Sequence, residues 1–414
     1  MKILIANCHF APDSFGGATV VAEETATRLA DMGHDVVVFT STSDGDLETH
    51  QLFRYESAGI PVVAIKVPER RTLRSEYDDP GVTRQFRQLL DAVRPDVVHV
   101  HAIQALGVGI LRAAQERGIP TVVTAHDAWW LCERQFMVRA TGEFCDQSAI
   151  DARVCATCVP DPVAHQMRQQ TSLELLNRCD RVLAPSAYWR DLLVASGVRA
   201  DIAAVNSNGV SRPRPGWRRS PRRGPVRLGY VGALSPAKGY PQLVDALRML
   251  QRSDYELVVV DSFSTLGFVT MSHTDWPVPG LVTIRGAYDS QTMDAFFDGV
   301  DALLFPSQWK ESYGLTVREA ALRGVWPILP DGGGTEDHIL TGRNGTVYRR
   351  DGGAVALAGA IGDYLDRFAD LAPETDVNSR IPPYDEQPDD LVGHLEAVAG
   401  PVTAPRIGAV SEGN

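Results

Sequence analysis

The sequence lacks the features that mark secreted, membrane-spanning and nucleic-acid-binding proteins. Its opening residues, MKILIANCHF, run directly into an apolar strand pattern and show no signal peptide. No stretch approaches the ~20 uninterrupted apolar residues that a membrane span requires. The formal net charge of -12 argues against a nucleic-acid partner and against strong adhesion to an anionic membrane. We therefore expect a cytoplasmic protein with reduced cysteines.

Short apolar runs, alternating with helical patterns, fill both halves of the chain. The 414 residues exceed what one ordinary core holds, so two domains are expected. Continuous apolar strands alternating with helices predict parallel sheets covered on both faces, an α/β fold with two Rossmann-like domains. The runs lie at residues 3–6, 36–39, 97–100, 121–124, 182–184, 202–205, 226–232, 257–260, 282–284, 302–305 and 327–329.

One segment interrupts this alternation. Residues 211–225, SRPRPGWRRSPRRGP, are rich in proline, glycine and arginine, which predicts a solvated linker. Its arginines would also suit a peripheral contact with anionic lipid, which nothing else in the sequence supports. The expected parts are an N-terminal domain (1–210) with a cysteine-rich insert (132–158), the linker (211–225), a C-terminal domain (226–385), a helix (386–400) returning to the N-terminal domain, and a flexible tail (401–414).

The most informative stretch is FPSQWKESYGLTVREA at 305–320, where two glutamates stand eight residues apart. Ligands of open α/β sheets bind at the carboxyl ends of strands, and Glu311 follows such an end. Gly314, Leu315 and Thr316 would open the next helix and present backbone N–H groups to a diphosphate. Glu319, on the same helix, would accept hydrogen bonds from a ribose, and Glu311 would face a sugar. Two solvated glutamates beside a helix start are the alternative, which the surrounding Pro-Ser and Gly-Leu-Thr disfavour.

These residues resemble glycosyltransferase family four, retaining enzymes with the GT-B fold, in which two Rossmann-like domains have parallel sheets that face each other across a cleft. The family pattern is Pro-Ser, then Glu, then an aromatic residue with Gly, then Glu-Ala. It is met at Pro306-Ser307, Glu311, Tyr313-Gly314 and Glu319-Ala320. The resemblance covers nearly the whole chain, and its further matches are Gly16-Gly17, His126, Pro185-Ser186, Asn208-Gly209-Val210, Gly232, Lys238-Gly239 and residues 331–336.

The resemblance implies transfer of a hexose from a nucleotide-sugar donor, with retention, by front-face displacement and without a catalytic cofactor. Lys238 would neutralise the donor diphosphate, and His126 would hydrogen-bond the donor sugar. Glu311 would contact sugar hydroxyls near the reacting carbon. Gly16 and Gly17 would let the backbone approach a phosphate or the acceptor. The acceptor stays open among a glycan, a lipid and a small molecule.

One position departs from the family pattern. Ala233 follows Gly232 where the family usually has arginine, and a charge-assisted contact is typically worth ~1.5–3 kcal/mol. Another cation would then act in its place, the donor would bind differently, or the chain would be a catalytically inactive partner subunit. A sugar-nucleotide epimerase of the same fold is the other alternative. A nicotinamide-dependent oxidoreductase is disfavoured, because the loop after the first strand lacks Gly-x-Gly-x-x-Gly.

Four of the six cysteines fall in one segment, at Cys132, Cys145, Cys155 and Cys158. So long a loop inside a compact domain is unusual and predicts a cross-link. Four thiolates in a reducing compartment suit a tetrahedral structural zinc ion, with an iron–sulfur cluster second and disulfides third. Unrelated thiols are the alternative, since only one Cys-x-x-Cys is present.

Overall fold

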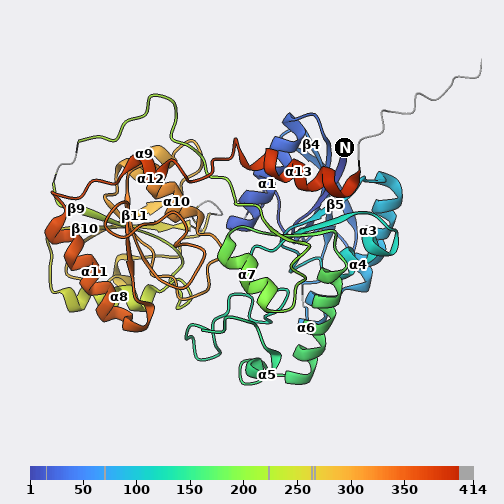
Figure 1. Ribbon diagram of the computed structural model, residues 1–414, viewed down its shortest axis with the longest axis horizontal. Coiled ribbons are helices and arrows are strands. Elements are labelled where there is room, and N and C mark those ends of the chain that lie inside the picture. The colour runs from blue at the N-terminus through green and yellow to red at the C-terminus, as the bar shows by residue number, and fades with distance from the viewer. Residues whose placement is uncertain (15, 70, 222–223, 263, 265–266, 401–414) are drawn as a thin grey trace, which may run out of the picture. The chain divides into compact units, whose positions relative to one another are not determined.

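The computed structural model describes residues 1–400 except 15, 70, 222–223, 263 and 265–266 (Figure 1). The expected tail at 401–414 lies outside the described residues. Within the described part of the chain, no helix combines the length and the apolar character needed to cross a bilayer.

The first sheet is mainly parallel and buried. Its strands are β1 (Lys2–Ala6), β2 (Asp35–Thr42), β3 (Leu52–Ser57), β4 (Ile60–Lys66), β5 (Val97–Val100), β6 (Thr121–Thr124), β7 (Arg181–Ala184) and β8 (Ala203–Val205). Their order is β3-β4-β2-β1-β5-β6-β7-β8. β3 and β4 pair antiparallel, as a hairpin that the sequence analysis missed, whereas β1, β2, β5 and β6 pair parallel. All four residues of β5 and of β6 are buried, as expected for strands covered on both faces.

Helices connect these strands and begin where the local sequence satisfies their first N–H groups. Asp79 caps α3 by accepting hydrogen bonds from Gly81 N and Val82 N, and Pro80 occupies the first helical position. Ser186 caps α7 by accepting from Trp189 N. The helices are α1 (Gly17–Asp31), α2 (Leu73–Tyr77), α3 (Pro80–Val93), α4 (Gly109–Glu116), α5 (Ala152–Cys155), α6 (Pro162–Asn177) and α7 (Ala187–Ala195).

The second sheet is wholly parallel. Its strands are β9 (Val226–Val231), β10 (Tyr255–Asp261), β11 (Leu281–Gly286), β12 (Ala302–Leu304), β13 (Trp326–Pro330) and β14 (Thr346–Tyr348), in the order β11-β10-β9-β12-β13-β14. The helical elements that follow along the chain are α8 (Tyr240–Leu250), η2 (His273–Asp275), α9 (Met293–Asp298), α10 (Leu315–Leu322), η3 (Arg350–Gly352), α11 (Gly353–Arg367) and α12 (Thr375–Asn378); α13 (Gln387–Ala399) is the last described helix and groups, from Pro388 on, with the first unit. The two α/β sheets confirm the predicted fold class, and the sequence analysis missed only β14 among the strands of this sheet.

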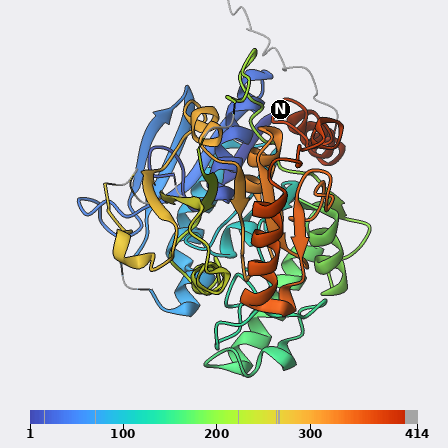
Figure 2. The same ribbon diagram turned by 90° about the vertical axis from the view of Figure 1, so that its left-hand side faces the viewer.

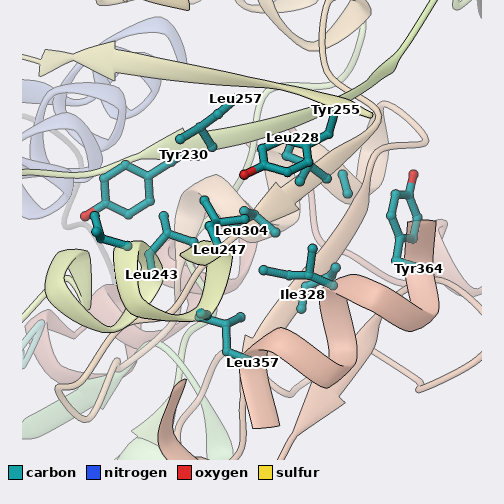
Figure 3. Packing of buried hydrophobic residues seen from close by; sticks show 14 of the residues in the cluster. Leu228, Tyr230, Leu243, Leu247, Tyr255, Leu257, Leu304, Ile328, Leu357 and Tyr364 are labelled. Atoms are coloured by element: carbon teal, nitrogen blue, oxygen red, sulfur yellow. The ribbon is translucent and has the colours of Figure 1, made fainter. Parts of the chain in front are cut away.

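Alternate residues of these strands enter two different cores, because side chains of a strand point to opposite faces. Leu257 and Leu304 pack with α8 and α11 on one face (Figure 3). Val258 and Leu303 pack with α9 and α10 on the other face. α8 and α11 also contact each other, and Figure 2 shows α11, in orange-red, lying along this sheet. The sheet therefore stands between two helical layers, which leaves the strand ends open to ligands.

Backbone contacts divide the chain into two units. Of the described residues, the first holds those within 1–125, 174–183 and 388–400, and the second holds those within 126–173 and 184–387. These units interleave along the chain, whereas the sequence analysis expected an N-terminal domain at 1–210 that includes the insert, a linker at 211–225, and a helix at 386–400 returning to the N-terminal domain. The expected boundaries stay predictions. The cysteine-rich insert belongs to the second unit, together with the second sheet.

The arginine-rich segment at 211–225 is bonded to buried aspartates of the second unit. Asp294 accepts hydrogen bonds from Arg214 N at 3.0 Å and from Arg323 Nε at 2.8 Å. Arg219 donates to Asp301 at 2.9 Å. Burial alone would raise the pKa of Asp294, but the hydrogen bonds from Arg214 and Arg323 lower that pKa below its usual value. The sequence analysis predicted a solvated linker, but these two carboxylates attach the segment to the second unit.

We predict that Asp294→Asn lowers the free energy of unfolding by about 3–5 kcal/mol, because it leaves Arg323 buried without a counter-charge. Denaturant unfolding at pH 7 measures this. Asp254→Asn is the control, since Asp254 pairs with Arg252 at the surface and such pairs contribute under about 1 kcal/mol. Equal effects of the two substitutions would contradict the prediction.

The same pair predicts a pH dependence. Because the pKa of Asp294 is lower in the folded than in the unfolded protein, its stabilising contribution is present above the unfolded value near ~3.9 and is lost as the pH falls through the folded value. The free energy of unfolding of Asp294→Asn, measured as a function of pH, should therefore fall less between neutral and acidic pH than that of the wild type.

Candidate functional site

Strand order reverses in the second sheet between β9 and β12. β10 and β11 lie on one side of β9, whereas β13 and β14 lie on the far side of β12. Ligands of open α/β sheets bind outside the carboxyl ends of the strands at such a reversal. The loop after β9 carries Lys238, and the loop after β12 carries Glu311. The topology therefore brings together two residues that are 73 positions apart in the chain.

Three donors converge on the Glu311 carboxylate. Its Oε1 accepts hydrogen bonds from Lys238 Nζ at 2.9 Å and from Ser307 Oγ at 2.9 Å. The indole N–H of Trp309 donates to the same oxygen. The Glu311 side chain is 9% exposed and that of Lys238 is 36% exposed. Solvent and ligands therefore reach this ion pair mainly from the lysine side.

Trp309 also contacts the lysine. Lys238 Nζ lies 4.5 Å from the centroid of the indole ring, within the range of a cation–π interaction. One side chain thus orients both members of the ion pair. The sequence analysis gave Trp309 no role, although it lies inside the quoted motif. Its contact with Lys238 became visible only when the folded chain placed the loop after β9 beside it.

Gly314 ends the β12 loop in a conformation that favours glycine. It has φ 79° and ψ 68°, and a Cβ atom there would lie 2.4 Å from Thr335 Cγ2. α10 begins at the next residue, so Leu315 and Thr316 form its first turn. The first N–H groups of a helix have no partner within the helix and attract anions. The predicted diphosphate contact therefore lies at a genuine helix start.

Glu319 is in the second turn of the same helix and is half-buried. Its Oε2 accepts a hydrogen bond from the Tyr288 hydroxyl at 3.1 Å. Burial raises the pKa of Glu319, while the Arg323 guanidinium and the Tyr288 hydrogen bond lower it. Tyr288 stacks on Phe296 with ring centroids 4.5 Å apart. The Tyr288 hydroxyl thus donates to the Glu319 carboxylate in the way that a ribose hydroxyl would. The sequence analysis missed Tyr288, which no motif marks.

His126 follows β6 and belongs to the same unit as Glu311. Its carbonyl oxygen accepts a hydrogen bond from Ser312 Oγ at 2.5 Å, and Ser312 O accepts one from Ser186 Oγ at 2.6 Å. The residue next to Glu311 is thus held by two segments from the first half of the chain. Burial lowers the pKa of His126 to about 4, so its imidazole is neutral at pH 7. A neutral imidazole both donates and accepts a hydrogen bond.

Close packing in the loop after β13 explains the glycine at position 334. A Cβ atom on Gly334 would lie 2.2 Å from Ser312 O and 2.4 Å from Ser186 Oγ. Gly334 N donates to Glu311 O at 2.8 Å. A side chain at this position would displace the Glu311 backbone.

Gly16 and Gly17 lie in the first unit, in the loop between β1 and α1. The order of the first sheet reverses between β1 and β5, so this loop also stands at a ligand-binding position of its own sheet. Gly16 has φ 83° and precedes the helix, which begins at Gly17. A Cβ atom on Gly16 would meet nothing within 4 Å, so only its backbone conformation favours glycine.

The position after Gly232 has no charge, because Ala233 stands there. Two cations that the sequence analysis did not assign follow strands of the same sheet. Lys310 is in the loop after β12, and Arg350 begins η3, two residues after β14 ends. The available sequence signal was a basic residue in the loop after a strand, a pattern too common to select them.

The four cysteines of the insert line one cavity of about 20 Å³ together with His165. Burial raises the pKa of Cys132 to about 11, and the cysteines are free thiols. Among the residues that the structure describes, no three His, Cys, Asp or Glu side chains are placed to hold a metal ion. The expected metal-binding property is therefore not supported. Two of the thiols, those of Cys145 and Cys155, share the side-chain amide of Gln147 as a hydrogen-bond donor, at 3.5 and 3.6 Å.

Two family models match the chain. Residues 15–214 match the model of Glycosyltransferase Family 4, and residues 217–367 match that of Glycosyl transferases group 1. A GDP-mannose-dependent alpha-mannosyltransferase of Mycolicibacterium smegmatis is 27% identical over 414 residues, which cover 97% of this chain and 98% of that protein. A glycogen synthase of Mycobacterium tuberculosis is 27% identical over 381 residues, 88% of this chain and 86% of that protein.

Solved structures share the fold over nearly the whole length. Anabaena Alr3699/HepE, solved in complex with UDP and glucose, has a TM-score of 0.67 at 19% identity, covering 96% of this chain and all of that one. Sucrose-phosphate synthase of Thermosynechococcus elongatus has a TM-score of 0.63 at 18% identity, covering 96% of each chain. The predicted GT-B fold class is thereby confirmed. The chain belongs to the glycosyltransferase family 4 group and is a glycosyltransferase of that type.

Proposed function

We propose that this protein transfers a hexosyl group, with retention, from a nucleoside-diphosphate sugar to a hydroxyl group of an acceptor. The observation that carries the proposal is the convergence of Lys238 and Glu311 at the reversal of strand order, next to the start of α10. A cation and free N–H groups suit a diphosphate, and a carboxylate suits sugar hydroxyls.

The leaving group determines what the site must stabilise. As the bond between the anomeric carbon and the phosphate oxygen breaks, negative charge grows on the nucleoside diphosphate. Lys238 and the first turn of α10 are the groups that would stabilise it, since positioned charges and N–H donors act where charge develops. Glu319 would bind the ribose through the oxygen that Tyr288 now contacts.

Retention is proposed to follow a front-face route. The acceptor oxygen forms its bond to the anomeric carbon on the face that the phosphate leaves, and its proton passes to a phosphate oxygen. Glu311 would hold sugar hydroxyls near the reacting carbon, and neutral His126 would hydrogen-bond the donor sugar. A covalent sugar trapped on Glu311 would overturn this route.

The donor base is the first property to measure. The similar proteins point to different donors. The mannosyltransferase is named as GDP-mannose-dependent, whereas Alr3699/HepE was solved in complex with UDP-glucose. A ligand that binds only the folded state at about 100 times its Kd stabilises it by ~2.7 kcal/mol. Thermal unfolding against nucleoside diphosphates and nucleotide sugars should therefore show a rise in Tm for one base.

A specific observation favours a second candidate, an inactive partner subunit. Ala233 removes a charge that the resemblance leads us to expect beside Lys238. If no nucleoside diphosphate and no nucleotide sugar raises the Tm, the transferase proposal fails and the inactive subunit becomes the better interpretation.

Lys238→Ala should weaken nucleoside diphosphate binding roughly 10- to 100-fold, because a charge-assisted contact is worth ~1.5–3 kcal/mol. Isothermal titration with the diphosphate and with the matching nucleoside measures this, and the nucleoside should bind equally well. Arg248→Ala, which changes an exposed cation on α8, is the control. Equal diphosphate affinity of Lys238→Ala and the wild type would show that no phosphate contact exists.

Glu311→Gln should lower kcat roughly 100-fold or more with little change in donor Kd, because the amide keeps the shape but removes the charge near the reacting carbon. Steady-state kinetics combined with donor titration measures both quantities. Glu374→Gln, at an exposed ion pair with Arg343, is the matched control. An unchanged kcat would refute the role of Glu311.

A structural zinc ion at Cys132, Cys145, Cys155 and Cys158 stays a proposal, supported by their shared cavity and their ligand type. His165 adds a buried imidazole in which neither nitrogen has a hydrogen-bond partner among the described residues. The free thiols agree with the proposed cytoplasmic location. Elemental analysis of the purified protein tests whether zinc is bound. A preparation that is folded and contains no metal would contradict the zinc proposal.

A further inference from the structure

Two cations without a carboxylate partner lie close to the candidate site. Lys310 precedes Glu311 in the loop after β12 and is only 5% exposed. Arg350 follows β14 and is partly buried. Neither side chain forms an ion pair with any residue that the structure describes. Lys310 and Arg350 belong to the same unit as the ion pair of Lys238 and Glu311.

In the described part of the chain, the side-chain nitrogens of both cations donate hydrogen bonds to uncharged groups. Lys310 Nζ donates to the Tyr188 hydroxyl at 3.1 Å and lies 4.9 Å from the centroid of the Phe144 ring. The guanidinium carbon of Arg350 lies 4.1 Å from the centroid of that same ring. Arg350 Nε donates to Asp331 O at 2.9 Å, and Nη1 donates to the carbonyl of Ser307. Both cations therefore share one aromatic ring from the cysteine-rich insert.

The nearby carboxylates are engaged elsewhere. Asp146 pairs with Arg139 at 2.8 Å. The Asp331 carboxylate accepts the backbone N–H of Arg350 at 2.9 Å and not its guanidinium. Burial lowers the pKa of Lys310 and that of Arg350, although Asp146 acts in the opposite direction on Lys310 and Asp331 and Glu311 do so on Arg350. Buried charges are normally paired, because leaving one uncompensated is costly.

We propose that Lys310 and Arg350 form an anion subsite that binds a phosphate group. Arg350 bonds to the backbone of Ser307, and the Ser307 hydroxyl donates to Glu311, so the subsite adjoins the candidate catalytic carboxylate. Cation–π contacts with Phe144 hold the two positive charges in place until an anion neutralises them. The subsite supplies positive charge to a site in which Ala233 supplies none.

This inference rests on the proposed function, and its phosphate has two possible sources. The donor diphosphate is one, in which case the subsite adds to the contacts of Lys238 and α10. A phosphate group on the acceptor is the other. The chemistry recognised is the same, but the second source requires the subsite to bind phosphate while the donor nucleotide is already present.

The test compares two adjacent arginines. Arg350→Gln removes the charge of the subsite, whereas Arg349→Gln changes an exposed arginine that pairs with Asp351. The probes are the nucleoside diphosphate that stabilises the wild type, its nucleoside, and inorganic phosphate added to protein saturated with that diphosphate. Isothermal titration calorimetry gives each Kd.

For a donor contact, Arg350→Gln should weaken diphosphate binding roughly 10- to 100-fold and leave nucleoside binding unchanged. For an acceptor contact, diphosphate affinity stays unchanged, and the wild type binds inorganic phosphate where Arg350→Gln does not. Arg349→Gln should match the wild type throughout. Unchanged affinity for both probes in Arg350→Gln overturns the subsite while leaving the proposed transferase intact, whereas a wild type that binds no nucleotide overturns the proposed function itself.

A second variant guards against loss of structure, because Arg350 also bonds to two backbone carbonyls. Lys310→Met keeps the length of the side chain and removes only the ammonium, so it should weaken the same probe that Arg350→Gln weakens. Arg350→Lys keeps the charge and should recover part of the affinity. Ala233→Arg, introduced into Arg350→Gln, should restore diphosphate binding if the donor is the source. A Lys310→Met protein with wild-type affinity for both probes contradicts the subsite.

Discussion

The reversal of strand order between β9 and β12 is the constraint on which the rest of the site depends. Because the two strands are neighbours, the loops that follow them open at the same place and in opposite directions. Strand order therefore brings Lys238 Nζ within 2.9 Å of Glu311 Oε1, although the two residues are far apart in the sequence. Leu303 and Leu304 point to opposite faces of the sheet and pack into its two cores, which fixes the position of β12. Core packing therefore determines the geometry of the ion pair.

Charge compensation organises the second unit at two levels. Away from the site, buried aspartates are matched by arginines, as in the pair of Asp294 and Arg323 at 2.8 Å. At the site the balance differs, since Lys238 has Glu311 but Lys310 and Arg350 have only neutral partners. This difference between paired structural charges and two cations with uncharged hydrogen-bond partners is the basis of the proposed anion subsite.

The cysteine-rich insert contributes to the site through its aromatic residues. Phe136 packs edge-on against Trp309 with ring centroids 4.5 Å apart. Lys310 and Arg350 both form cation–π contacts with the ring of Phe144. Gln135 and Met137, on either side of Phe136, both have positive φ, a conformation that costs energy for residues other than glycine. The backbone strain coincides with the residue that touches Trp309. The insert thus supports the loop after β12, whether or not its thiols bind a metal.

The sequence by itself determined the elements and the motif. Apolar runs of the β5 kind have only one stable environment, a sheet covered on both faces, so their positions and the α/β class followed from local pattern. The spacing of Glu311 and Glu319 around Gly314 likewise depends only on a strand end and a helix start. The sequence analysis missed β3, which is half-exposed and has no continuous apolar run, and it also missed β4, although residues 62–65 form a buried apolar run.

Only the tertiary structure decided which of these residues meet. The partners of Glu311, Lys238 and Trp309, come from two loops, and His126 reaches Ser312 across 186 positions of sequence. Such contacts depend on strand order and on packing in two cores, which no local window contains. Four nearby cysteines predict a metal, and only the folded chain shows that all four line one cavity; the metal itself stays a prediction. Spacing along the chain limits which side chains can meet, whereas the direction in which each one points is set by the backbone that carries it.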